Sequence, residues 1–171
     1  MSDYDAVASA YDRGMRPLEW LILGRLRQRA FAGLSGRVLE LGVGTGANLP
    51  LHGQAAHVVA CDVSRAMLEQ AARRPGHRAA LVQADAQRLP FASGSFEAAS
   101  GALVFCSLAD PARGLAEARR VLQRGGNLTL LDQMRGRWLG ALFTDALQPI
   151  SQRWSHECRL DREPARAGSH A

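Results

Sequence analysis

Residues 38–46 read Val-Leu-Glu-Leu-Gly-Val-Gly-Thr-Gly, an apolar run that holds one acid and ends in three glycines at alternate positions. The apolar residues are typical of a buried parallel strand. Glycine is needed where a turn requires a positive φ angle or where a ligand approaches the backbone closely. The stretch therefore predicts a strand, a tight turn and a helix start whose N–H groups face a polar ligand.

A second apolar run, residues 58–61, ends at Asp62, which lies 20 residues after Gly42. At this spacing a β-α-β unit places a carboxylate on the two hydroxyl groups of a ribose. The glycines and the acid together predict that the chain binds a nucleoside-like cofactor.

The composition excludes several classes of protein. The 171 residues fit one domain, and no apolar run is long enough to span a membrane. All 21 basic residues are arginine, which excludes a lysine nucleophile, and they are scattered despite the net charge of +5, so we expect no nucleic-acid partner. Cys61, Cys106 and Cys158 lack metal-site or disulfide spacing. We therefore expect no metal and a cytoplasmic location.

Strands and helices alternate along most of the chain. We expect helices at 3–13, 17–31, 46–52, 64–74, 111–123 and 138–154, and strands at 37–42, 57–61, 79–83, 96–104 and 128–132. Ser64 is the expected N-cap of one helix, and Pro111 the first residue of another. The alternation predicts an α/β fold, a Rossmann-like, doubly wound and mostly parallel sheet of strand order 3-2-1-4-5, with the ligand at the carboxyl ends of the strands.

Three features favour S-adenosylmethionine over a nicotinamide cofactor. The glycines follow G-x-G-x-G rather than the G-x-G-x-x-G of a pyrophosphate-binding turn. Glu40 would repel a pyrophosphate but attract an α-ammonium group. After the third strand, Asp85 would accept a hydrogen bond from the exocyclic amine of adenine, and Ala86 and Leu89 would cover the ring. The alternative role of Asp85 is that of a turn acid or helix cap.

Residues 40–46, 61–64, 84–91 and 95–97 resemble class I S-adenosylmethionine-dependent methyltransferases of the type-11 group. Residues 4–12 are similar to the lid helix of ubiquinone/menaquinone C-methyltransferases and bacterial phosphatidylethanolamine N-methyltransferases, and residues 103–111 and 158–162 resemble small thiol S-methyltransferase-like proteins. The resemblance implies direct in-line transfer of a methyl group to a small apolar or lipid-like acceptor: a quinol, an aminolipid or a thiol.

The predicted cofactor site combines the strand ends with the N-terminal segment. Its residues are Tyr11, Glu40, Gly42, Gly44, Gly46, Asp62, Val63, Asp85, Ala86 and Ala102. Tyr11 and Ser107 are the candidates for catalytic residues, with Tyr4 and His156 as further side chains near the methyl group. The alternative roles are packing on a neighbouring helix for Tyr11 and capping of the next helix for Ser107. The apolar residues of 20–23 and 138–143 would line a pocket, contact a membrane surface peripherally, or cover the sheet.

Residues 1–171 are expected to form a single domain, with lid helices at 1–32 and a C-terminal helix and tail at 136–171. This organisation leaves no length for strands 6 and 7, which such enzymes usually have. We expect the helix at 138–154, or a second copy in a homodimer, to cover the edge of the fifth strand. The alternatives to an active methyltransferase are a catalytically silent cofactor-binding subunit and, at lower weight, a nicotinamide-dependent reductase.

Overall fold

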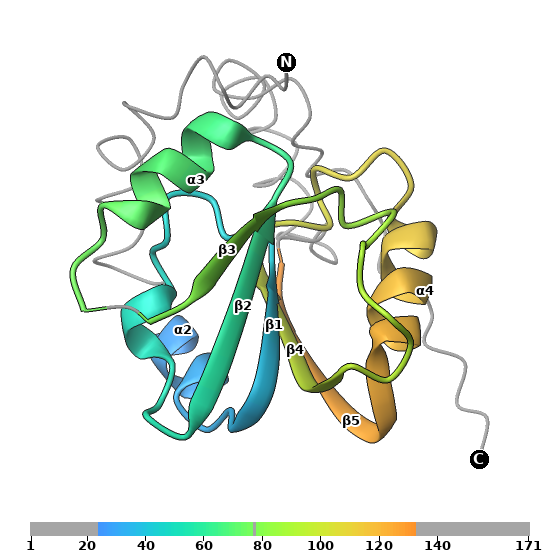
Figure 1. Cartoon of the computed structure of the whole chain (residues 1–171), viewed down its shortest axis with the longest axis horizontal. Coiled ribbons are helices and arrows are strands. Elements are labelled where there is room, and N and C mark those ends of the chain that lie inside the picture. The colour runs from blue at the N-terminus through green and yellow to red at the C-terminus, as the bar shows by residue number, and fades with distance from the viewer. Residues whose placement is uncertain (1–23, 77, 133–171) are drawn as a thin grey trace, which may run out of the picture.

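A computed structural model describes residues 24–76 and 78–132 of the chain (Figure 1). These residues form a five-stranded sheet of order β3-β2-β1-β4-β5, in which all neighbouring strands are parallel. The strand order predicted from the sequence is confirmed. In chain order the elements are α2 Gly24–Phe31, β1 Gly36–Leu41, η2 Leu49–Leu51, β2 Ala56–Asp62, α3 Arg65–Ala72, β3 Ala80–Gln83, β4 Phe96–Ala102, α4 Pro111–Val121 and β5 Leu122–Leu131.

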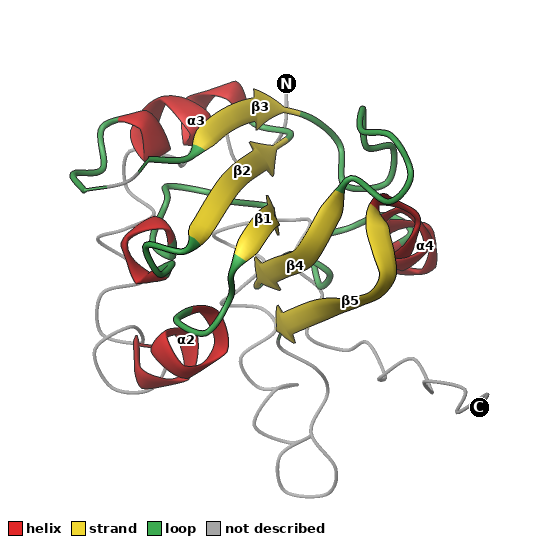
Figure 2. Cartoon of the chain, turned by 60° about the horizontal axis from the view of Figure 1, so that its bottom comes forward, coloured by secondary structure: helices red, strands yellow, loops and turns green. Residues whose placement is uncertain are grey.

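Helices cover both faces of the sheet: α2 and α3 lie on one side and α4 on the other (Figure 2). Successive residues of a strand point to opposite faces, so β1 contributes to both layers. Leu39 belongs to the main core, together with Val121 of α4. Val38 faces the other layer and shares a second cluster with Phe31 of α2. The sheet is therefore doubly wound, as expected.

Two of the helix starts agree with the sequence prediction. The hydroxyl of Ser64 accepts a hydrogen bond from the backbone N–H of Met67 at 3.2 Å and caps α3. Helix α4 begins at Pro111, and the carboxylate of Asp110 caps it by accepting from the N–H of Arg113 at 3.0 Å. Both caps satisfy N–H groups that have no partner within their own helix.

The helix predicted at 46–52 is wrong. The structure has a single 3-10 turn there, η2, which contains Pro50. Gly42, Gly44 and Gly46 have φ angles of 57°, 54° and 82°, and no helix can include residues with these values. The backbone is already extended at His52, so too few residues remain for an α-helix.

The junction between α4 and β5 also differs from the prediction of a helix to residue 123 and a strand from 128. Helix α4 ends at Val121, and β5 begins at Leu122 with Gly125 and Gly126 inside it. The pairing with β4 shifts register here, and Gly125 has a φ angle of 79°. A Cβ on Gly126 would lie 2.9 Å from the carbonyl oxygen of Glu97. The glycines let β5 bulge and remain paired, instead of forming a turn before it.

Several predictions concern residues outside the described part of the chain. They are the helices at 3–13 and 138–154, the first part of the helix at 17–31, the tail, and everything said of strands 6 and 7 or of the cover on β5. The end of the helix at 17–31 is described as α2. Among the helices of residues 24–76 and 78–132, none has both the length and the apolar character needed to cross a bilayer.

Candidate functional site at the carboxyl ends of the strands

The glycine turn after β1 contains one position that is open to a ligand. A Cβ on Gly42 would lie 2.4 Å from Cγ2 of Val104, and a Cβ on Gly46 would lie 3.1 Å from Cα of Ala71. These two glycines let the turn pack against the loop after β4 and against α3. Among residues 24–76 and 78–132, a Cβ on Gly44 would meet nothing within 4 Å. Gly44 therefore exposes its backbone to whatever approaches the turn.

Asp62 ends β2 beside this turn and is bonded to it. One carboxylate oxygen accepts from the N–H of Gly44 at 2.8 Å, and the other accepts from the N–H of Ser64 at 2.9 Å. A carboxylate offers about four acceptor positions, so hydroxyl groups can share it with backbone N–H groups. Asp62 thus fixes the turn to the start of α3 and remains suited to binding ribose. The next residue, Val63, is 50% exposed at the same edge of the sheet.

Glu40 lies behind the turn and is fully buried. Its carboxylate accepts from Nδ2 of Asn48 at 2.8 Å and lies 2.8 Å from Nε2 of His52. Nη1 of Arg27 donates to Oδ1 of Asn48 at 2.6 Å, so Asn48 joins the two buried charged side chains. The contact of Glu40 with a cofactor amino group stays a prediction, because the hydrogen-bond partners that the structure gives it, Asn48 and His52, flank η2.

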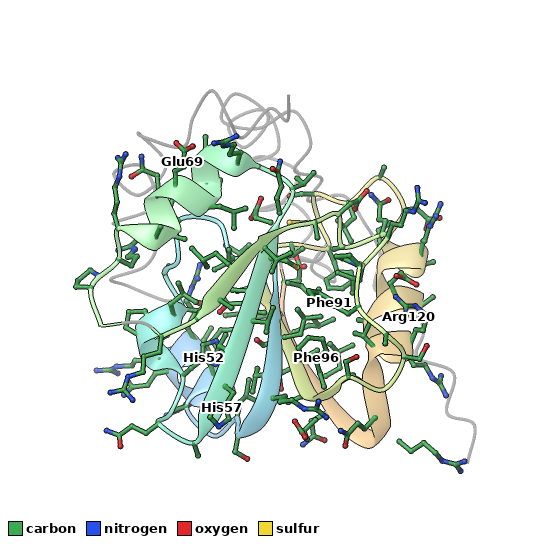
Figure 3. All side chains as sticks on the ribbon, viewed as in Figure 1. His52, His57, Glu69, Phe91, Phe96 and Arg120 are labelled. Atoms are coloured by element: carbon green, nitrogen blue, oxygen red, sulfur yellow. The ribbon has the colours of Figure 1, made fainter. Side chains whose placement is uncertain are left out.

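The partners of Glu40 carried no signal in the sequence. His52 follows η2, and its ring lies 5.8 Å from that of Phe31, on the α2 side of the sheet (Figure 3). Asn48 and Arg27 are also distant from Glu40 along the chain. They meet only because the segment after the glycine turn folds back along β1.

The segment after β3 carries the residues predicted to bind adenine. Asp85 is exposed, and Oδ1 of its carboxylate accepts from the N–H of Gln87 at 2.8 Å. This is the turn role that the sequence left open as the alternative, and contact with adenine stays a prediction. Ala86 and Leu89 are 7% and 5% exposed and belong to the main core. Both residues predicted to cover the ring therefore belong to the core, and their contact with adenine stays a prediction. The exposed residues of the segment include Asp85, Arg88 and Pro90.

Strand β4 ends at Ala102, earlier than the predicted residue 104. The next residue, Leu103, has a φ angle of 59°, which is outside the strand region and disfavoured for a leucine. Its N–H donates to the carbonyl of Leu131 at 2.8 Å, so the neighbouring strand fixes this conformation. Ala102 is 8% exposed. A strained backbone at the ligand end of a parallel sheet is a frequent feature of functional loops.

An acid that the sequence did not single out fixes the loop after β4. The carboxylate of Asp132 accepts from the N–H of Phe105 at 2.6 Å and of Cys106 at 3.3 Å. Ser107 follows directly and is partly exposed. The N-cap of α4 is Asp110, so the structure does not give Ser107 the alternative role of capping this helix. Asp132 is the last residue of the strand expected at 128–132. An acid at the carboxyl end of a strand is the signal by which the sequence could have indicated a role for Asp132 at this edge of the sheet.

Three of the side chains predicted near the methyl group, Tyr4, Tyr11 and His156, lie outside the described residues. The other predicted site residues lie at the carboxyl ends of β1, β2, β3 and β4 or in the loops that follow them. The carboxylates of Asp62 and Asp85 favour a ligand that presents hydroxyl and amino groups. Together with the open backbone at Gly44, this set fits S-adenosylmethionine. Within residues 24–76 and 78–132, no group of three His, Cys, Asp or Glu side chains is placed to hold a metal ion.

Comparison with known proteins agrees with this arrangement. A family model described as a methyltransferase domain matches residues 39–130. The demethylmenaquinone methyltransferase of Clavibacter sepedonicus is 37% identical over 139 residues, covering 75% of this chain and 56% of that protein. The phosphatidylethanolamine N-methyltransferase of Cereibacter sphaeroides is 30% identical over 146 residues, covering 76% of this chain and 69% of that protein. The chain thus spans little more than half the length of the first of these relatives.

A solved structure shows the same fold. The S-adenosylmethionine-dependent methyltransferase of Aquifex aeolicus superimposes with a TM-score of 0.64 at 21% identity, over 79% of this chain and 76% of that one. The family model extends from β1 to β5, so it includes the glycine turn, Asp62, Asp85 and the loop after β4. Because this match spans more than half of the chain, the chain belongs to the methyltransferase domain family, whose cofactor is S-adenosylmethionine.

Proposed function

We propose that the chain is an S-adenosylmethionine-dependent methyltransferase that transfers the methyl group directly to a small apolar or lipid-like acceptor. The observation that carries the proposal is the meeting of three features at adjacent strand ends: the open backbone of Gly44, the carboxylate of Asp62 bonded to it, and the exposed turn at Asp85. A nucleoside linked to a cationic amino acid offers the hydroxyl and amino groups that these carboxylates can bind.

The cofactor, when bound, supplies a methyl group already activated by its sulfonium charge. The residues of the chain therefore have to bind and orient more than they have to activate. In this proposal Asp62 holds the ribose hydroxyls, Gly44 lies against the sugar and methionine portion, and Asp85 with Ala86 holds the adenine. Orientation of two reactants can contribute up to roughly 7–11 kcal/mol of barrier reduction, so the site needs no elaborate set of acids and bases.

The acceptor is proposed to be a quinol or an aminolipid, with a thiol as the third class. The names of the relatives in Clavibacter sepedonicus and Cereibacter sphaeroides specify demethylmenaquinone and phosphatidylethanolamine, which supports the first two classes. Ser107, in the loop after β4, and Tyr11 are the proposed residues beside the attacking atom. A carbon or ammonium acceptor must also lose a proton, whereas a thiol near neutral pH ionises readily.

Calorimetric titration tests the cofactor part of the proposal. The chain should bind S-adenosylhomocysteine and not NADH. Asp62→Ala should weaken that binding by at least about tenfold, corresponding to about 1.4 kcal/mol. It should also lower the free energy of unfolding by about 1.5–3 kcal/mol, because two backbone N–H groups lose a charged acceptor. Glu97→Ala is the matched control, since the carboxylate of Glu97 accepts from the backbone N–H of Arg37 at the amino ends of β1 and β4, away from the site.

Methyl transfer from labelled S-adenosylmethionine to a panel of quinols, aminolipids and thiols tests the activity. Transfer to one class identifies the acceptor. Saturable cofactor binding with no transfer would favour the catalytically silent subunit, and binding of NADH alone would favour the reductase.

The cytoplasmic location, the homodimer and the peripheral membrane contact are further proposals that rest on the sequence. Sedimentation velocity and flotation with anionic lipid vesicles test the last two.

A further inference from the structure

The segment between β3 and β4, residues 84–95, is attached to α4 at both of its ends. On the β3 side, the side chain of Gln87 donates to the carboxylate of Asp85 at 3.1 Å and accepts from the backbone N–H of Asp110 at 2.7 Å. On the β4 side, the N–H of Gly94 donates to the carbonyl of Arg120 at 3.0 Å. The Asp85 turn is thus part of a segment whose position depends on α4.

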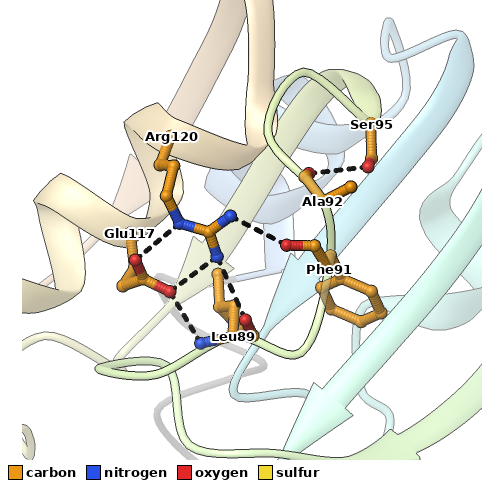
Figure 4. Close-up of polar contacts among 6 residues, drawn as sticks. All are labelled: Leu89, Phe91, Ala92, Ser95, Glu117 and Arg120. Atoms are coloured by element: carbon orange, nitrogen blue, oxygen red, sulfur yellow. Dashed lines mark hydrogen bonds and ion pairs between the residues drawn. The ribbon is translucent and has the colours of Figure 1, made fainter.

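Between these two attachments, Glu117 and Arg120 of α4 hold the middle of the segment (Figure 4). The carboxylate of Glu117 accepts from the N–H of Leu89 at 2.8 Å. The guanidinium of Arg120 donates to the carbonyl of Leu89 at 3.0 Å and to the carbonyl of Phe91 at 2.8 Å. The residue between them, Pro90, has no N–H to bond. The pair therefore binds three polar groups within three residues of a backbone that lies outside any strand.

Glu117 and Arg120 also bind one another, with Nε of Arg120 2.7 Å from Oε1 of Glu117 and Nη2 2.8 Å from Oε2. Their side chains are 20% and 35% exposed, whereas the ion pair of Arg65 and Glu69 on α3 is 80% and 57% exposed. An exposed helical ion pair contributes little to stability. A partly buried one that also bonds to backbone groups fixes those groups in place.

The aromatic ring of Phe91 strengthens this attachment. It packs edge-on against Phe96 of β4, with ring centroids 5.2 Å apart, in the layer between the sheet and α4 (Figure 3). The backbone of the segment is thus bonded to α4 at Leu89 and Phe91, while its side chains enter the main core. The Asp85 turn, four residues before Leu89, has little freedom to move while these contacts persist.

We propose that Glu117 and Arg120 are positioning residues for the cofactor base: they hold residues 85–91 so that the Asp85 turn is set in advance for the 6-amino group of adenine. The inference rests on the proposed function, because it assigns the turn to adenine. Neither side chain touches the cofactor in this scheme, since both act through the backbone of Leu89 and Phe91. The effect of losing the pair is therefore specific to the base and leaves the ribose and methionine contacts unchanged.

Calorimetry with two ligands tests the proposal. The first is S-adenosylhomocysteine, and the second is its analogue in which purine replaces adenine, so that only the 6-amino group is missing. The wild-type chain should prefer the adenine ligand by about tenfold or more, as expected for one hydrogen bond to a carboxylate. Glu117→Ala and Arg120→Ala should lose most of this preference by weakening the adenine ligand alone. Glu69→Ala removes a helical ion pair without a loop contact and should keep the preference.

Amide hydrogen exchange tests, without any ligand, how firmly residues 85–91 are held. Exchange at residues 85–91 should accelerate in Glu117→Ala and remain at the wild-type rate in Glu69→Ala. Should a variant fail to fold, Glu117→Gln keeps an acceptor for the N–H of Leu89 but loses the charge that holds Arg120, and its preference should fall between those of the wild type and Glu117→Ala.

Equal weakening of both ligands, or an unchanged preference with slow exchange, overturns the positioning role while leaving the proposed function intact. If the wild-type chain binds neither ligand, the proposed function fails and the inference fails with it. The two failures are thus distinguishable.

Discussion

Gly44→Ala should distinguish an effect on cofactor binding from an effect on the stability of the fold. Gly44 has a φ angle of 54°, and a Cβ placed on it would meet no atom of the described part of the chain within 4 Å. The free energy of unfolding of the variant should therefore fall only by the cost of an alanine in the left-handed conformation, about 1–2 kcal/mol. Gly76 has a φ angle of 80° and is equally open, so Gly76→Ala carries the same backbone cost away from the site.

The two variants should unfold at similar urea concentrations but differ in ligand binding. A carbon atom prefers a partner at about 3.5–4.0 Å, so a methyl group on Gly44 would occupy the space of any cofactor that lies against the turn. We expect Gly44→Ala to bind S-adenosylhomocysteine at least about tenfold more weakly than Gly76→Ala, a difference of about 1.4 kcal/mol. Gly42→Ala should instead fail to fold normally, because its Cβ would lie 2.4 Å from Cγ2 of Val104.

Equal affinities of Gly44→Ala and Gly76→Ala would refute the reasoning. The open side of the turn would then face solvent, and the cofactor would have to bind elsewhere. Urea denaturation and calorimetry on the same protein samples keep the two effects apart.

Three more predictions concern other parts of the described structure. Asp132→Ala should lower the free energy of unfolding by about 1.5–3 kcal/mol, because two N–H groups of the loop after β4 lose a charged acceptor. Urea denaturation measures this change, and an unchanged midpoint would contradict it. Hydrogen bonding from Arg120 lowers the pKa of Glu117 from 4.5 to about 2. Glu117 thus stabilises the fold above pH 4.5, and this contribution is lost as the pH falls toward 2, so Glu117→Gln should show a flatter loss of stability across that range. Burial raises the pKa of the Cys61 thiol to about 12, so iodoacetamide at pH 8 should modify Cys61 only after unfolding. Rapid labelling of Cys61 in the native chain, located by peptide mapping, would contradict the burial.

The surroundings of Glu40 illustrate what the sequence could not predict. Its position before the glycines predicted an acid near the cofactor, and the acid is indeed at the end of β1. Burial among Asn48, His52 and Arg27 was not predictable, because these residues have no regular spacing relative to Glu40. A buried carboxylate needs hydrogen-bond partners, but the sequence does not say which segment will supply them.

The junction of α4 and β5 shows a second limit. Paired glycines usually end a helix, so the sequence predicts that the helix beginning at Pro111 stops before Gly125 and Gly126. Whether glycines make a turn or a bulge depends on the partner strand, and here the carbonyl of Glu97 leaves no room for a side chain at Gly126. The contacts of β4 therefore decided the start of β5.

The sequence alone determined the glycine turn, the place of Asp62 and the caps of α3 and α4. Each of these depends on residues close together in the chain, through the φ angles that glycine permits or the hydrogen bonds of a cap. The order of the strands was predicted from the alternation of strands and helices along the chain. Only the tertiary structure decided which side chains surround Glu40, how Asp132 fixes the loop after β4, and how Glu117 and Arg120 hold the segment at Leu89. Those contacts join residues far apart in sequence, and they form only once parallel strands have brought their carboxyl ends to one edge of the sheet.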